Sequence, residues 1–95
     1  MIEVSKQTVN ELLEKNKGSW LLTEEIISQE EYNFHNQCII VPCNMVDSRK
    51  YNTKINKLIS YRMIQARQAE NRYIISCDDI SHIDKRIRLC IDKKH

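Results

Sequence analysis

The sequence predicts a mostly helical domain with a small β-hairpin, an α+β fold, and three observations favour it. The 95 residues include one Gly and one Pro, too few for the tight turns of an all-β protein. Apolar side chains recur at helical spacing in several segments. A polar turn near residues 68–71 separates two short stretches with β-favouring side chains. A chain of this length is expected to form one domain, residues 1–95.

The first expected helix runs from Ser5, a candidate N-cap, to about Asn16. Gly18 follows it, where a left-handed conformation can end a helix. The apolar stripe of this helix consists of Val9, Leu12 and Leu13.

The second expected helix follows an extended "WLL" at residues 20–22. Thr23 is its candidate N-cap, and the glutamates at 24–25 suit the positive end of the helix dipole. A long segment, residues 29–44, then contains "CIIV", which is typical of a short strand that Pro42 would stop.

The third expected helix, residues 48–60, is the most distinctive segment of the chain. Asp47 or Ser48 would cap it. Its remaining positions are almost all cationic or amide side chains, which suits contact with a nucleic-acid backbone. The apolar stripe of this helix consists of Tyr51, Ile55, Leu58 and Ile59.

Two short strands, Met63–Arg67 and Arg72–Cys77, are expected next, joined as a hairpin whose tip carries Arg67 and Arg72. The segment 78–95 has acids at its start and bases at its end, which favours a closing helix, although "RIRLCID" also permits a strand.

The charge is distributed unevenly along the chain, although the formal net charge is only +2. Residues 1–47 carry eight carboxylates and three lysines, a formal charge of −5, whereas residues 48–95 carry twelve bases and five carboxylates, +7. A basic patch on one contiguous element is expected of a protein that binds a polyanion. The alternative is a solvated helix face, which usually mixes both signs.

The four cysteines are expected to be reduced thiols in or near the core. A zinc site is the alternative, because His35, Cys38 and Cys43 lie close in sequence, although their spacing is not the tight pair of a zinc knuckle. We expect no cofactor. The sequence contains no Gly-rich phosphate loop and no HExxH pair, and we expect no enzymatic activity.

The sequence contains no run of about 18 apolar residues that could span a membrane. The first residues, "MIEVSKQTVNELLEK", are acidic and amphipathic, unlike a signal peptide. We therefore expect a cytoplasmic protein.

The order of helix, capped second helix, basic third helix and hairpin resembles a winged helix-turn-helix domain of the small bacterial operon-regulator type. "DSRKYNTKINKLISYRMIQARQAENRYIIS" looks like the recognition helix and wing, and "WLLTEEIIS" like the entry strand and second helix. The resemblance covers about residues 5–77. The sequence departs from the family in lacking a Gly before the wing and in the long segment 29–44.

The resemblance implies a sequence-specific transcription regulator that binds double-stranded DNA through the helix at 48–60 and the wing at 63–77. The apolar stripe of residues 78–95 suggests a homodimer through this segment, and the alternative is that the segment packs against the first helix of its own domain. The alternative function is a protein-interaction module, a small inhibitor or adaptor on the same scaffold. The DNA-contacting residues that the resemblance implies are Ser48, Arg49, Lys50, Asn52, Thr53, Lys54, Asn56, Lys57, Arg67, Gln68 and Arg72.

Overall fold

The protein is an α/β domain built on a parallel sheet. The computed structural model describes residues 1–49 and 53–94, and for residues 53, 66, 67, 93 and 94 the backbone alone. The five strands lie in the order β2-β3-β4-β1-β5, and every pair of neighbours is parallel. The strands are β1 (Ile2–Ser5), β2 (Trp20–Leu21), β3 (Cys38–Pro42), β4 (Arg72–Ser76) and β5 (Lys93–Lys94).

The connections between parallel strands carry the helices, because a parallel pair needs a crossover rather than a tight turn. The helices are α1 (Val9–Lys15), α2 (Glu24–Ile27), α3 (Cys43–Val46), α4 (Thr53–Ile64), α5 (Ala66–Ala69) and α6 (Lys85–Arg88), with one 3₁₀ helix, η1 (Ile80–His82). The prediction of a mostly helical winged helix-turn-helix domain with a hairpin is therefore wrong.

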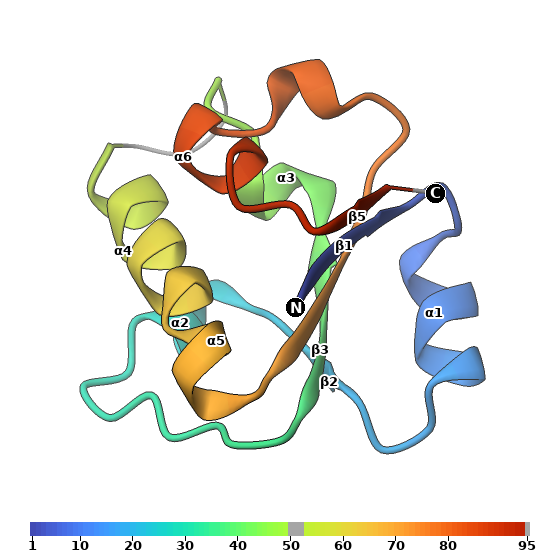
Figure 1. Ribbon diagram of the computed structural model, residues 1–95, viewed down its shortest axis with the longest axis horizontal. Coiled ribbons are helices and arrows are strands. Elements are labelled where there is room, and N and C mark those ends of the chain that lie inside the picture. The colour runs from blue at the N-terminus through green and yellow to red at the C-terminus, as the bar shows by residue number, and fades with distance from the viewer. Residues whose placement is uncertain (50–52, 95) are drawn as a thin grey trace.

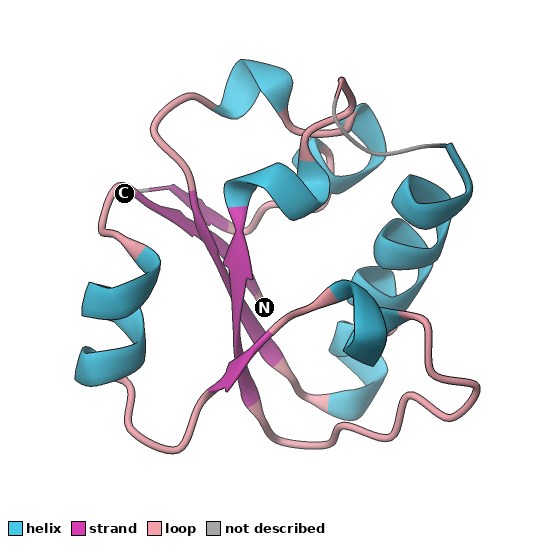
Figure 2. Cartoon of the chain, turned by 180° about the vertical axis from the view of Figure 1, so that it is seen from behind, coloured by secondary structure: helices cyan, strands magenta, loops and turns pink. Residues whose placement is uncertain are grey.

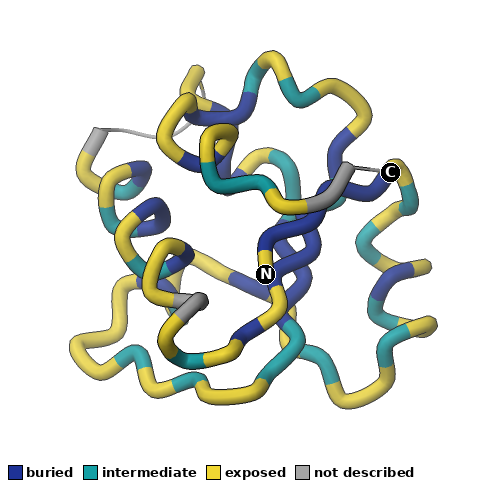
Figure 3. The backbone as a smooth tube through the Cα atoms, in the orientation of Figure 1, coloured by how far each residue is buried: buried dark blue, intermediate teal, exposed yellow. Residues whose placement is uncertain are grey.

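The sheet separates two unequal helical layers (Figures 1 and 2). Helix α1 covers one face, and Leu12 packs there against Ile40 and Ile74. The other helices cover the opposite face and enclose the larger core, which appears as a buried centre in Figure 3. Its fully buried members from strand and helix include Tyr73 and Ile59, both with 0% of their surface exposed.

Strand β1 occupies residues that the sequence assigned to the chain end and to the start of the first helix. All four of its residues are buried, and it pairs with β4 in the register Ser5↔Ser76. Helix α1 starts later, because Thr8 rather than Ser5 is the N-cap and forms a capping box with Glu11. Gly18 has the expected positive φ of 84°.

The second expected helix and the strand after it are confirmed. The Thr23 side chain accepts a hydrogen bond from the backbone N–H of Ile26 at the start of α2. The "CIIV" segment forms β3, which ends at Pro42.

Helix α4 corresponds to the expected basic helix but is displaced along the chain. Ser48 does not cap it; its backbone N–H donates to the carbonyl oxygen of His82. The predicted strand 63–67 is wrong, because α4 continues to Ile64 and buries Met63 completely. No Gly or Pro interrupts residues 53–64, so the helix has no reason to stop at Ser60.

The expected closing helix over 78–95 is also wrong, because the segment forms η1, α6 and β5 in turn. Asp79 and Asp84 each accept a hydrogen bond from a backbone N–H two residues later, which starts a new short helix at each aspartate. Ile83 and Ile87 are both 1% exposed within this domain's own core. The apolar stripe of this segment thus belongs largely to the fold itself.

Candidate functional site

The carboxyl ends of the parallel strands meet at one edge of the sheet and form a cavity of about 290 Å³. In the register, Ser76 pairs with both Ser5 and Pro42, so the residues that follow these three come together. We call this cavity the carboxyl-edge crevice. It is lined by Lys6, Gln7, Thr8, Cys43, Asp47, Arg49, Ser76, Cys77, Asp78, Asp79 and His82.

The crevice lies where the chain path divides between the two faces of the sheet. After β1 the chain passes to α1 on one face, whereas after the neighbouring β4 it passes to η1 and α6 on the other (Figure 1). In open α/β sheets, ligands bind outside the carboxyl ends of the strands at such a switch point. The fold therefore points to this edge independently of the side chains.

Hydrogen bonds fix the loop after β1 that forms one wall of the crevice. The Ser76 hydroxyl donates to the carbonyl oxygen of Gln7 at 2.6 Å, and the Gln7 N–H donates to the Ser5 hydroxyl at 3.2 Å. Lys6 is exposed between these anchors. Its ammonium group thus extends from a loop that the neighbouring strand holds in place.

Asp47 and Arg49 form an ion pair on another wall. Arg49 donates to the two carboxylate oxygens through Nε at 3.1 Å and Nη2 at 3.0 Å, and its backbone N–H donates at 2.9 Å. These hydrogen bonds lower the pKa of Asp47 to about 2. The Asp47 side chain is 6% exposed and the Arg49 side chain 59%, so the guanidinium group keeps donors available to a ligand.

Asp79 and His82 stand on the wall after β4. The hydrogen bonds from Ser81 lower the pKa of Asp79, and its carboxylate oxygen Oδ2 lies 3.8 Å from Nε2 of His82. Cys77, the residue after β4, has its Sγ 2.7 Å from Sγ of Cys43 and donates to the Asp79 carbonyl oxygen at 3.1 Å.

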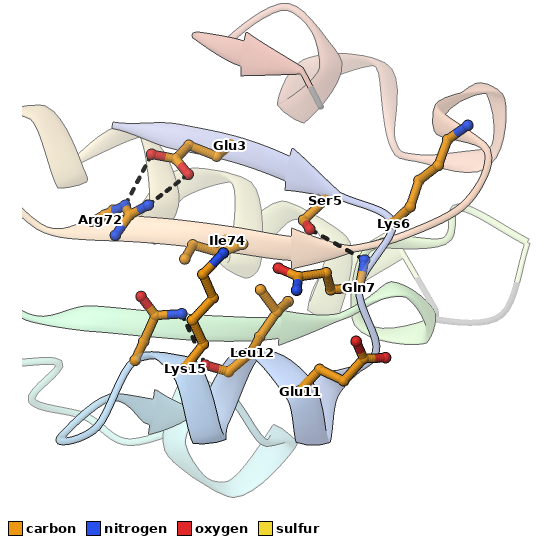
Figure 4. Close-up of a pocket in the computed structure, with 10 residues that line it drawn as sticks. Glu3, Ser5, Lys6, Gln7, Glu11, Leu12, Lys15, Arg72 and Ile74 are labelled. Carbon is orange, nitrogen blue, oxygen red and sulfur yellow. Dashed lines mark hydrogen bonds and ion pairs between the residues drawn. The ribbon is translucent and has the colours of Figure 1, made fainter.

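A second and larger cavity, of about 550 Å³, lies on the face of the sheet beside α1 (Figure 4). Glu3 of β1 and Arg72 of β4 are ion-paired along it. Lys6 and Gln7 line both cavities, so the cavity beside α1 and the carboxyl-edge crevice meet at the loop after β1.

The described members of the predicted DNA-contacting set lie on different parts of the molecule. Arg49 lies at the carboxyl edge, whereas Arg72 begins β4 and is bound to Glu3. Gln68 lines a third cavity, and Asn56 is only 5% exposed, which does not suit base contact. Ser48, Lys54 and Lys57 are exposed, Lys50 and Asn52 lie outside the described residues, and the side chains of Thr53 and Arg67 are not described.

The zinc alternative gains no support from the geometry. Cys38 starts β3 and Cys43 follows its end, so the two lie at opposite ends of the strand. Within residues 1–49 and 53–94, no three His, Cys, Asp or Glu side chains form a group that could hold a metal ion.

The residues that line the crevice carried a weak signal in the sequence. Each of the buried strands "IEVS" and "RYIIS" is followed directly by polar residues, "KQT" and "CDD". That pattern indicates a site only once the two strands are known to be parallel neighbours, and their pairing joins residues about 70 positions apart.

The fold and the crevice together define an α/β domain with a cavity, lined by charged residues among others, at the carboxyl edge of a parallel sheet. Comparisons with models of protein families, with curated proteins and with solved structures found no match. In the part of the chain that the structure describes, no helix is both long enough and apolar enough to cross a membrane.

Proposed function

We propose that this protein binds a small phosphorylated molecule that also bears hydroxyl groups, such as a sugar phosphate or a mononucleotide, in the carboxyl-edge crevice. The observation that carries the proposal is the position of the crevice, between the diverging connections of β1 and β4 at the carboxyl ends of the strands. Its volume of about 290 Å³ suits a small ligand.

The charges in the crevice support this ligand class. Lys6 and Arg49 supply cationic donors from two different walls, and both suit a phosphate group. Asp78 and Asp79 supply carboxylates on the wall after β4, where they can accept hydrogen bonds from hydroxyl groups. A ligand that carries both an anionic group and hydroxyl donors satisfies both sets, whereas a bare anion faces the two carboxylates without compensation.

The proposal is tested by calorimetry and thermal unfolding with ribose 5-phosphate, ribose and inorganic phosphate as separate probes. Ribose 5-phosphate should bind and raise the unfolding temperature, because a ligand of the folded state stabilises it. Ribose and phosphate should each bind more weakly. Lys6→Ala should weaken the binding of ribose 5-phosphate about tenfold, because one charge-assisted hydrogen bond is lost.

Lys54→Ala is the matched control, because it removes the same charge from an exposed position on α4, outside the crevice. It should leave the affinity unchanged. If both variants weakened the binding of ribose 5-phosphate equally, the effect would come from the overall charge and not from the crevice, which would contradict the proposed site. A lack of binding by all three probes would also contradict the proposal.

A second candidate function is contact with a nucleic-acid backbone through α4. The observation that favours it is that Lys54 and Lys57 are exposed on this helix and form no ion pair with the other described residues. This second candidate keeps only the helix of the expected DNA-binding surface. The predicted wing is absent because α4 extends into residues 63–64, and Arg72 is ion-paired with Glu3.

A further inference from the structure

Two cysteines stand next to each other at the carboxyl edge of the sheet. Strands β3 and β4 are parallel neighbours, and their last paired residues are Pro42 and Ser76. Cys43, the first residue of α3, and Cys77 each follow directly after one of these paired residues, so both leave the same end of the sheet. Their Sγ atoms are 2.7 Å apart.

This placement meets the geometric demands of a disulfide bond. The residues just before the two cysteines, Pro42 and Ser76, are paired on neighbouring strands, which lie about 4.8 Å apart, and disulfide-bonded Cα atoms span about 4.4–6.8 Å. From 2.7 Å the sulfur atoms need to approach by about 0.65 Å to reach the bonded distance of about 2.05 Å. Formation of the bond therefore requires little movement of the sheet.

The two thiols differ in access, which gives them different roles. Cys43 is half-buried and Cys77 is 6% exposed, and both line the carboxyl-edge crevice. A small reagent in the crevice reaches Cys43 more readily. The other two cysteines lie elsewhere, Cys38 at the opposite end of β3 and Cys90 after α6.

We propose that Cys43 and Cys77 are a reversible dithiol–disulfide couple, described here in its reduced form. The Cys43 thiolate attacks one sulfur of a low-molecular-weight disulfide, whose S–S bond breaks and releases one thiol. Cys77 then attacks Sγ of Cys43 in this mixed disulfide, forms the internal bond and expels the second thiol. Two protein thiols lose two electrons, the small disulfide gains them, and the two protons end on the released thiols.

The couple does not depend on the ligand proposed for the crevice, because bond formation needs only the two thiols and the small disulfide. Its test and the ligand-binding test can therefore fail separately. Disulfides of this kind in reducing compartments are usually transient or redox-sensing.

The experiment is a redox titration of the full chain with mixtures of reduced and oxidised glutathione, under native conditions and in concentrated urea. Free thiols are blocked, and the bond is located by peptide mass spectrometry. The folded protein should form the Cys43–Cys77 bond with an equilibrium constant roughly a hundredfold larger than the unfolded chain, because the native sheet holds the thiols together.

Variants test separately whether Cys43 is the attacking thiol and whether Cys77 is the resolving thiol. The double variant Cys38→Ser, Cys90→Ser should titrate like the natural chain. Cys77→Ser should stop at a mixed disulfide on Cys43, seen as one added glutathionyl group. An equilibrium constant no larger in the folded than in the unfolded chain, or native bonds that join other cysteines, would overturn the proposal.

Discussion

Glu3 of β1 accepts two hydrogen bonds from Arg72 of β4, from Nε to Oε1 and from Nη2 to Oε2, each at 2.9 Å. Figure 4 shows the pair joining the two neighbouring strands beside α1. The Glu3 side chain is 5% exposed and the Arg72 side chain 48%. The arginine that the sequence suggested for a hairpin tip thus stabilises the centre of a parallel sheet.

Arg72→Ala should lower the free energy of unfolding by about 1–2 kcal/mol, because it leaves a buried carboxylate without its guanidinium group. Loss of one partner from a fully buried pair costs about 3–5 kcal/mol, and the half-exposed arginine reduces that value. Urea unfolding measures the change. A double-mutant cycle with Glu3→Gln should give a clear coupling energy, and additive effects would contradict the pairing.

Asp47→Asn should destabilise the protein in a pH-dependent way. The pKa of Asp47 in the folded protein is about 2, below its unfolded value of about 3.9. The contribution of Asp47 to the free energy of unfolding is therefore fully present above the unfolded pKa and is lost as the pH falls through the folded pKa. The difference in unfolding temperature between the two proteins should be largest near neutral pH and approach zero below about pH 2.

Asp78→Asn is the control for this experiment, because Asp78 is an exposed aspartate in the same cavity. It should change the stability by no more than about 0.5 kcal/mol. A constant difference between Asp47→Asn and the natural chain across the acid range would contradict the assigned ion pair.

Ile2→Ala should destabilise the protein by about 2 kcal/mol or more, because Ile2 is 3% exposed in β1 and its truncation leaves a cavity. Leu89→Ala is the control, since Leu89 is 77% exposed, and it should change the stability by about 0.5 kcal/mol or less. Urea unfolding of both variants measures the contrast. Equal, small effects would mean that residues 2–5 do not form a core strand.

Lys54→Ala and Lys57→Ala test the second candidate function. If α4 contacts duplex DNA, each variant should reduce the slope of log affinity against log salt by about one unit, because each removes one phosphate contact. Lys15→Ala on α1 removes the same charge from the opposite side of the sheet and should leave the slope unchanged. Affinity that does not depend on salt would exclude this surface.

Local signals in the sequence predicted the elements whose start and end depend on neighbouring residues. They predict Thr23 as a cap and Pro42 as the end of a strand, and the structure has both. They also predict a strand at residues 72–77, and the structure has β4 at Arg72–Ser76. The strand 63–67 was wrong because a short apolar run without Gly or Pro fits a helix equally well. In the structure, Glu70 makes the turn into β4 with a positive φ of 58°. A positive φ is uncommon for residues other than Gly, so the sequence does not predict a turn at this glutamate.

The fold class could not be predicted because the pairing that defines it is remote in sequence. Strand β1 is four residues long, and its register with β4, Ile2↔Tyr73, leaves no local trace. The candidate site depends on that pairing, because Lys6 and Asp78 approach each other only when β1 and β4 are neighbours. Residues 48–95 carry the excess of positive charge, yet within them Arg49 and Arg72 are ion-paired with Asp47 and Glu3.

Amide chemical-shift mapping by NMR during titration with ribose 5-phosphate tests the proposed ligand site most directly. The predicted result is a set of saturable shifts at residues 6–8 and 77–79, on the two loops that follow β1 and β4. Shifts concentrated along α4, or none at a large excess of the probe, would contradict it.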